Sequence, residues 1–223
     1  MNRGSEWNKW DLHFHTQSSY DYKDKTVTNI QLIEKLVEKD VKVVAITDHH
    51  IIDVERIQDL KVLSSERITI LPGIEFLSDS RGKQPIHFIG IFSENSDLNY
   101  IWGQIENRTE IRKIKGEGKK ENEVYCNLFE TINLIHELGG IVSIHAGDKH
   151  SSIENITHSL PHGEAQKTDI AFAVDIYELG NSSDQDGYRK FVFPSIKKNI
   201  PMILCSDNHD IKKYDIKIGR AHV

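Results

Sequence analysis

Seven short apolar runs, most of them followed by a helix-like segment, limit what this chain can fold into. We predict strands over residues 10–15, 41–47, 68–71 continuing into 73–76, 86–92, 141–145, 174–179 and 202–205. Helices are predicted over residues 29–39, 54–66, 124–138 and 188–198, where apolar residues recur every three or four positions. Buried strands that alternate with amphipathic helices are typical of a parallel sheet covered by helices, and seven such units favour an α/β barrel over an open sheet.

Charge and apolar content exclude some classes of protein. Lys and Arg number 28 against 34 Asp and Glu, so the formal charge of −6 gives no overall positive field for nucleic acid, and only a local basic patch stays open. No apolar run approaches the roughly 20 residues that cross a bilayer, and the N-terminus lacks a hydrophobic signal core. We therefore predict a cytoplasmic protein without a membrane partner. Cys126 and Cys205 are isolated in sequence and indicate neither a disulfide framework nor a paired-cysteine site.

Two polar stretches and the C-terminal residues stand apart from this pattern. Residues 106–123 are mostly charged, which predicts a solvated loop or an exposed helix, and residues 147–169 predict a second polar loop. The last six residues, IGRAHV, resemble a translated sequencing adapter more than natural protein. We therefore expect residues 218–223 to be a non-native tail of a truncated gene, and we leave His222 out of the candidate site.

Histidine and acidic residues recur on the predicted strands and at their ends. They are His13 and His15 on the first strand, Asp48, His49 and His50 after the second, and then Glu75, His87, His145, Glu178, Asp207 and His209 on or after the later ones. The C-terminal strand ends of a parallel barrel form one rim, where active sites of barrel enzymes lie.

A metal centre is the simplest explanation for this set. A lone histidine after a strand is more often an ordinary loop or core residue, and we read His136, His158 and His162 in that way. Residues two apart on a strand face the same side, so His13 and His15 would project together. A buried group of imidazoles and carboxylates is costly unless cations neutralise it. Histidine and carboxylate donors without thiolate favour Mn or Zn, with Fe open, over a purely oxygen-ligated Mg site.

The motifs resemble those of the PHP (polymerase and histidinol phosphatase) family. DLHFHT, ITDHH, PGIE, HFIG, IHELGGIVSIHAG and CSDNHD occur in that order over residues 10–210. The resemblance implies a distorted seven-stranded TIM-like β/α barrel, with residues 1–217 as a single PHP domain. SSYD and HAGDK are most similar to PHP domains at the N-terminus of TrlF-type ATPases, which implies an ATPase domain C-terminal to this one in the natural protein.

The resemblance also implies nine ligand positions for two or three divalent metal ions. Carried over, His13, His15, Glu75 and Asp207 would hold the first ion; Glu75, His87 and His145 the second; and Asp21, His49 and His209 the third. Some family members have histidine where Asp21 stands, which would change the metal preference of the third position or weaken it.

Other residues near the rim have candidate supporting roles. Lys149 is a candidate cation for a substrate phosphate. Asp48 would orient a ligand or cap the following helix, and Glu178 would support a ligand. His50 and Asp148 are weaker candidates for protonating a leaving group.

We therefore expect a metal-dependent phosphoesterase. Bridging ions would turn a shared water into hydroxide and stabilise an in-line displacement at phosphorus. The candidate catalytic residues are Glu75, Asp207, His209 and Lys149, and the substrate would be a phosphorylated small molecule or nucleotide. Two alternatives remain, a nuclease acting on DNA or RNA and a non-catalytic, metal-stabilised regulatory module of a larger ATPase. An amide hydrolase is less favoured, because such barrels often carry a bridging lysine where this chain has Glu75.

Overall fold

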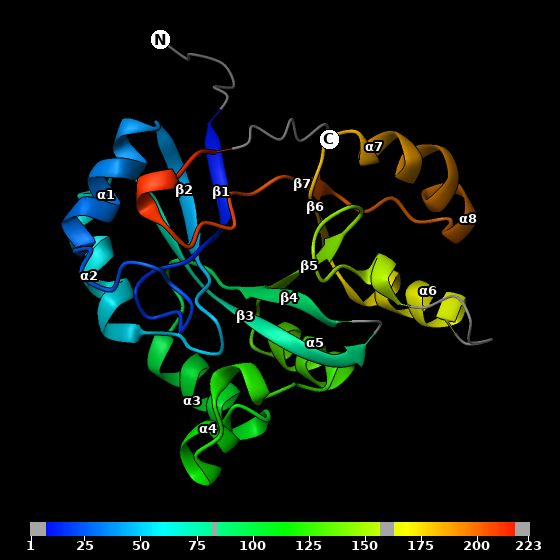
Figure 1. The fold of residues 1–223 in the computed structure, drawn as a ribbon, viewed down its shortest axis with the longest axis horizontal. Helices are drawn as coiled ribbons and strands as arrows, with labels where there is room; N and C mark the ends of the chain where they lie inside the picture. The colour runs from blue at the N-terminus through cyan, green and yellow to red at the C-terminus, as the bar shows by residue number, and fades with distance from the viewer. Residues whose placement is uncertain (1–7, 82–83, 157–162, 217–223) are drawn as a thin grey trace.

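A curled seven-stranded sheet forms the centre of the molecule, with helices arranged around its outside (Figure 1). The computed structural model describes residues 8–81, 84–156 and 163–216. Each strand lies beside its neighbours in sequence, in the order β1 (Lys9–Phe14), β2 (Val41–Ile46), β3 (Thr69–Arg81), β4 (Pro85–Ile91), β5 (Ile141–Ala146), β6 (Ile176–Leu179) and β7 (Met202–Ile203). The predicted α/β fold with a distorted seven-stranded barrel is confirmed.

One strand of the sheet runs against the others, so the prediction of a wholly parallel sheet is wrong. The pairs among β1, β2 and β3 and among β5, β6 and β7 are parallel, whereas β4 is antiparallel to both β3 and β5. Only residues 82–84 separate β3 from β4, and a parallel crossover needs roughly a dozen residues or more. The start of β4 therefore lies near the sheet end where its parallel neighbours finish.

The barrel is closed by hydrogen bonds between β1 and the segment that follows β7. The Asp207 amide donates to the His13 carbonyl over 3.0 Å, and the His15 amide donates to the Asn208 carbonyl over 3.2 Å. β7 has only two residues. The segment after it therefore pairs with β1 in place of the longer last strand that closes a regular barrel. It also places residues from the two ends of the described chain next to each other.

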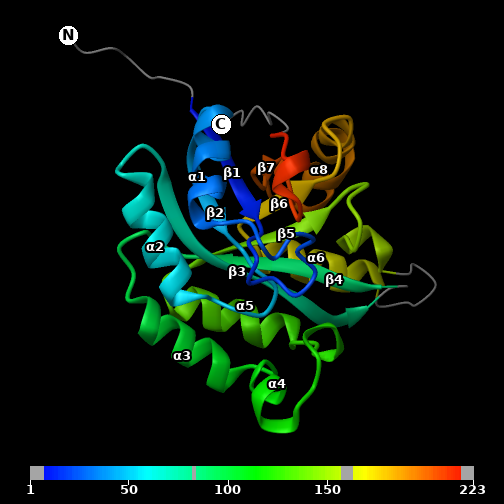
Figure 2. The ribbon, with the colours of Figure 1, turned by 60° about the vertical axis from the view of Figure 1, so that its left-hand side comes forward.

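The helices lie in three groups around the sheet. In Figures 1 and 2, α1 (Asn29–Glu38) and α2 (Val54–Ser64) flank β1 and β2. Below β3 and β4 lie α3 (Leu98–Arg108), α4 (Arg112–Glu117) and α5 (Leu128–Glu137). The last group, beside β5 to β7, contains α6 (Gly163–Ala173), α7 (Asp184–Gly187) and α8 (Phe193–Ile196).

Polar caps determine where several helices begin. Thr28 forms a capping box with Gln31 at α1, and Asp53, Asp97 and Asn127 accept amide hydrogen bonds at the first turns of α2, α3 and α5. The Asn127 cap explains why α5 begins four residues after the predicted start at residue 124. The predicted helix over residues 188–198 is divided into a π-helical turn (Tyr188–Val192) and α8, and α7 precedes it directly.

The two predicted polar loops have different outcomes. The end of α3, α4 and a 3-10 turn (Glu121–Glu123) occupy much of residues 106–123, so the exposed-helix alternative is confirmed there. The loop predicted for residues 147–169 is wrong at its end, because α6 begins at residue 163. His158 and His162 lie outside the described residues. Among those described, Cys126 and Cys205 are buried free thiols, and no helix has the length and apolar character needed to span a membrane.

Apolar side chains form two buried clusters. The larger one packs the outer face of the sheet against the helices and includes Phe14 and the stacked rings of Phe76 and Phe88. The smaller one fills the inside of the curl with residues from β1, β2, β4 and the segment after β7, namely Leu12, Ala45, Ile89, Ile91 and Cys205. The polar residues of the candidate site therefore lie at one end of a filled barrel.

Replacing Gly73 by alanine should destabilise the fold. A Cβ at this position of β3 would lie 2.9 Å from the Thr47 methyl group, 3.0 Å from the Gly90 carbonyl oxygen and 3.1 Å from that of Ile46. Gly73→Ala should lower the free energy of unfolding by about 1–3 kcal/mol in urea titrations. The control is Gly103→Ala in α3, where a Cβ would meet nothing within 4 Å. This change should raise the free energy of unfolding by about 0.4–1 kcal/mol. Equal effects of the two changes would contradict this packing.

Candidate metal centre

All nine predicted ligands lie together at one end of the barrel. They form, with Glu178, four groups of three or four residues in which one nitrogen or oxygen atom per residue lies within 4.8 Å of the others. The groups are His13, His15, Glu75 and Asp207; His15, Asp21, His49 and His209; His49, Glu75 and His87; and His13, His145 and Glu178. Because they share residues, the groups form one continuous centre.

Glu75 lies at the middle of this centre and is 1% exposed. Its Oε2 lies 3.0 Å from His13 Nε2 and 3.1 Å from His15 Nε2. Its Oε1 lies 2.6 Å from His87 Nδ1 and 3.7 Å from His145 Nε2. The two oxygens of one carboxylate thus face two different sets of imidazoles, as a carboxylate that bridges two ions must.

The first ligand group closes around a small space between ring nitrogens. His13 Nε2 and His15 Nε2 are 2.9 Å apart, and Asp207 Oδ1 lies 3.4 Å from the first and 3.6 Å from the second. Two facing ring nitrogens can share only one proton, whereas a cation between them would bind both lone pairs and the carboxylate. The structure thus brings together the four residues expected to hold the first ion.

Asp21 reaches the third group from the loop after β1. Its Oδ2 lies 3.4 Å from His49 Nε2 and 3.2 Å from His209 Nε2, and the His209 ring stacks on His15 at 3.8 Å between centroids. Ser19, which sequence reasoning missed, joins this group to the first one. It lies 3.1 Å from His15 Nδ1, and its hydroxyl donates to Asp21 Oδ1 over 3.0 Å.

Hydrogen bonds at Nδ1 orient several of the imidazoles. His13 Nδ1 lies 2.9 Å from Glu178 Oε2, and His145 Nδ1 lies 2.9 Å from the His150 carbonyl oxygen. A carbonyl oxygen or carboxylate only accepts, so both Nδ1 atoms carry a proton, and Nε2 is the nitrogen of each ring that faces the centre and could bind an ion. This arrangement, in which the second ring nitrogen is fixed from outside, is typical of histidine that binds a metal ion.

Among the described residues, five buried ring nitrogens have no hydrogen-bond partner: both nitrogens of His50, and one nitrogen each of His49, His145 and His209. Two of them, His49 Nδ1 and His145 Nε2, lie 3.4 and 3.7 Å from the Glu75 oxygens. Unpaired buried nitrogens are rare and costly. Donors that share an ion about 2.0–2.2 Å from each are separated by distances of this order. The residues present therefore fit divalent ions of the kind that histidine and carboxylates bind.

Carboxylates change the charge state of the two histidines on β1. Burial acts to lower the pKa of His13, but the negative charges of Glu178 and Asp207 outweigh it and raise that pKa well above its usual value. Burial also opposes the charged form of His15, whose hydrogen bonds to Asp207 and Glu75 raise its pKa to about 9. Protons thus balance the buried carboxylates in the ion-free protein, and a bound cation would replace them.

Lys149 and Glu178 lie directly behind the first ligand group. The Lys149 ammonium is 2.7 Å from Glu178 Oε1 and 3.0 Å from Asp207 Oδ2, and its side chain is 10% exposed. Burial opposes the charge on Lys149, but the two carboxylates raise its pKa above the usual value, so it stays an ammonium. Glu178 is fully buried, and the structure agrees with its expected role in supporting a ligand.

The remaining candidates near the rim have structural contacts. Asp48 accepts hydrogen bonds from the backbone amide and the hydroxyl of Thr16, both over 2.6 Å, and so ties the end of β2 to the loop after β1. It does not cap α2, because Asp53 does. Burial lowers the pKa of His50 to about 3, which leaves a neutral ring that is a poor proton donor. Asp148 is exposed beside the centre.

The centre opens to solvent on one side. A hollow of about 480 Å³ is lined there by Asp21, Asp207 and His209, together with Lys23 and Lys213. These three candidate ligands are the more exposed members of the centre, and the hollow is a route for a ligand to reach it.

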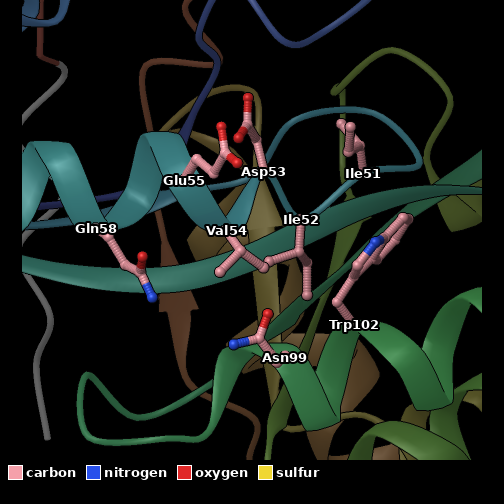
Figure 3. A pocket seen from close by; sticks show the side chains of 8 residues that line it. All are labelled: Ile51, Ile52, Asp53, Val54, Glu55, Gln58, Asn99 and Trp102. Atoms are coloured by element: carbon pink, nitrogen blue, oxygen red, sulfur yellow. The ribbon is translucent and has the colours of Figure 1, made fainter.

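A second hollow, of about 570 Å³, lies between the start of α2 and α3. Figure 3 shows Asn99 and Trp102 of α3 facing Ile52 and Val54 across it. It has no residue in common with the four ligand groups.

The family of the chain follows from its sequence. Residues 11–169 match the PHP domain. The chain belongs to the PHP domain family. The match runs from within β1 to beyond β5 and covers most of the candidate ligands, and it confirms the family to which the motifs pointed. The narrower likeness to TrlF-type ATPases stays a prediction. A comparison with curated proteins gives no match.

Several solved structures share the fold of this PHP domain. One, assigned as a metal-dependent phosphoesterase from Bifidobacterium adolescentis, has a TM-score of 0.58 and 15% identity over 96% of this chain and 92% of that one. An amidohydrolase from Chromobacterium violaceum, with bound sulfate and no metal, has a TM-score of 0.56 and 16% identity over 91% and 88%. A two-domain protein from Bacteroides vulgatus contains a predicted PHP-like metal-dependent phosphoesterase; it has a TM-score of 0.55 and 15% identity over 92% and 53%.

Divalent metal should stabilise the protein. Mn²⁺ at roughly 100 times its dissociation constant should add about 2.7 kcal/mol to the free energy of unfolding. For a chain of this size, that corresponds to a rise in melting temperature of roughly 5–11 °C. Glu75→Gln should lose most of that rise, because Glu75 faces two ligand groups. The control is His136→Gln, which changes a surface histidine paired with Asp175 and should keep the full rise. No rise in the wild type, or an equal rise in Glu75→Gln, would contradict the site.

Proposed function

We propose that this PHP domain is a metal-dependent phosphoesterase that hydrolyses a phosphate ester with two or three divalent ions. The observation that carries the proposal is the position of Glu75, whose two oxygens face different imidazole sets at 2.6–3.1 Å. Such an arrangement suits adjacent ions that act on one phosphate. The donor set of imidazoles and carboxylates favours Mn or Zn, with Fe as a further candidate.

The chain supplies a rigid frame for this chemistry. Divalent ions, when bound, activate a water molecule for attack and neutralise charge on the phosphate. His13 and His15 are held by β1 and by Nδ1 contacts, and Asp207 is fixed to β1 through its backbone. Glu75 couples the two sets of imidazoles, so that the ligands on either side keep a fixed separation. We propose catalytic roles for Glu75, Asp207 and His209 on this basis.

The hollow beside the centre has the size of a site for a small molecule. Its volume of about 480 Å³ falls within the range of small-molecule sites. Lys23 and Lys213 line it together with four aspartates, Asp21, Asp207, Asp210 and Asp215, so bound metal ions would have to supply most of the attraction for a phosphate. We propose a phosphorylated small molecule or a nucleotide as the substrate.

The surface gives less support to a nuclease. The basic residues near α4 are paired with glutamates, as in the ion pairs of Lys113 with Glu110 and of Arg108 with Glu137. A phosphate backbone would have to displace these partners, and the formal charge of −6 would repel it at long range.

Turnover of a monoester should depend on metal and on the β1 histidines. We expect the metal-loaded protein to hydrolyse p-nitrophenyl phosphate, to lose activity with a chelator and to regain it with Mn²⁺ or Zn²⁺. His13→Ala should lower kcat/KM by roughly 100-fold or more, since even residues that only support a ligand are worth about 10–100-fold. His136→Gln should retain wild-type activity, because its ring lies on the surface with Asp175.

The same assay separates the competing functions. The panel adds bis(p-nitrophenyl) phosphate, single-stranded DNA and RNA, and an acyl p-nitroanilide. Cleavage of nucleic acid alone would identify a nuclease, and cleavage of the anilide alone would identify an amide hydrolase. Full metal occupancy without turnover of any member of the panel would identify a non-catalytic module.

A further inference from the structure

We propose that Lys149 and Glu178 form a buried ion pair that positions two ligands of one metal ion. The two ligands are His13 and Asp207, and the pair contacts each through the atom that faces away from the ion. This inference rests on the metal centre proposed above and gives a positioning role to two residues outside the nine predicted ligands, one of which, Glu178, also lies in the group with His13 and His145.

The contact with His13 fixes which ring nitrogen is free. Glu178 Oε2 and Oε1 lie 2.9 and 3.1 Å from His13 Nδ1, and Glu178 is fully buried. A carboxylate accepts the proton of Nδ1, which leaves Nε2 as the ring nitrogen that can bind an ion. That Nε2 is the atom 3.0 Å from Glu75 Oε2, inside the first ligand group. Glu178 therefore orients the ring and makes Nε2 a stronger ligand for a metal ion.

The contact with Asp207 fixes which carboxylate oxygen is free. Lys149 Nζ lies 3.0 Å from Asp207 Oδ2, whereas Oδ1 points to His13 Nε2 and His15 Nε2 at 3.4 and 3.6 Å. The ammonium thus occupies one oxygen and leaves the other for the ion. Asp207 has a φ of 51°, a left-handed conformation that is uncommon for a residue with a side chain. Its orientation is therefore maintained by its contacts and not by local preference.

The two members of the pair also need each other. A buried carboxylate is costly without a neighbouring cation, and Lys149 Nζ lies 2.7 Å from Glu178 Oε1. Gly180 allows this approach: a Cβ there would lie 2.8–3.0 Å from backbone atoms of Asp148 and Lys149. The loop after β5 is thus pressed against the end of β6, and this contact keeps the ammonium beside Glu178.

These contacts favour positioning over the phosphate-binding role that the sequence predicted for Lys149. The ammonium is 10% exposed and already contacts two carboxylate oxygens within 3.0 Å. A substrate phosphate would have to displace one of them. Lys23 and Lys213 line the open hollow, and they could face a substrate there without leaving a buried carboxylate.

The test is a titration of the metal-free protein with Mn²⁺. Binding is measured by calorimetry and by the electron paramagnetic resonance signal of free Mn²⁺. Lys149→Met and the near-isosteric Glu178→Gln should each lower the affinity for one Mn²⁺ ion by roughly 10–100-fold and leave the affinity for the other ions unchanged. The double variant should lose about as much as either single one, because the pair acts as a unit. The control is Lys167→Met, which removes a lysine with 15% exposure paired with Glu154 and should bind Mn²⁺ like the wild type.

Several outcomes would overturn this inference. Unchanged Mn²⁺ affinities in both single variants would do so, as would additive losses in the double variant. An unchanged Mn²⁺ affinity with a raised KM for p-nitrophenyl phosphate in Lys149→Met would make Lys149 a substrate ligand instead. The readout is ion binding and not turnover, so a wild type that binds Mn²⁺ without hydrolysing any ester would refute the phosphoesterase proposal alone.

Discussion

A buried negative charge at Glu75 is the constraint on which the rest of this site depends. The carboxylate is 1% exposed and has no lysine or arginine within ion-pair distance among the described residues, so imidazoles and their protons must balance it. An unbalanced buried carboxylate costs several kcal/mol. The curl of the sheet makes the balance possible, because it turns β1, β4 and β5 toward β3 and brings their histidines to the two oxygens of Glu75.

Local patterns in the sequence were enough to predict the strands and the barrel, and the resemblance to PHP domains supplied the nine candidate ligands that the structure brings together. The spacing of His13 and His15 predicted that both rings face one way, and they do. His87 lies in the centre as predicted, but the direction of its strand differs from the prediction. We expected it on a parallel strand, but it lies near the start of the reversed β4, and that start is at the ligand end of the sheet. The predicted strands left nine residues, 77–85, between them, and the structure shortens this link to residues 82–84 because β3 continues to Arg81.

The contacts that hold the ligands in place were harder to predict. Glu178 and His13 are 165 residues apart, and no periodicity relates them. Ser19 resembles any loop serine in the sequence, although it joins His15 to Asp21. Lys149 has the sequence of an exposed loop lysine and becomes buried only because Gly180 lets its loop approach β6. Such contacts arise from the tertiary fold, which local propensity does not specify.

The central claim is that Glu75 bridges two metal ions, and a crystal of the Mn²⁺-loaded protein tests it most directly. An anomalous difference map should show one peak between Glu75 Oε2 and the group that contains His13, His15 and Asp207. It should show a second peak on the Oε1 side, where His87 and His145 lie. A map with no peak beside Glu75, or with ions only at the exposed Asp21, would contradict the account.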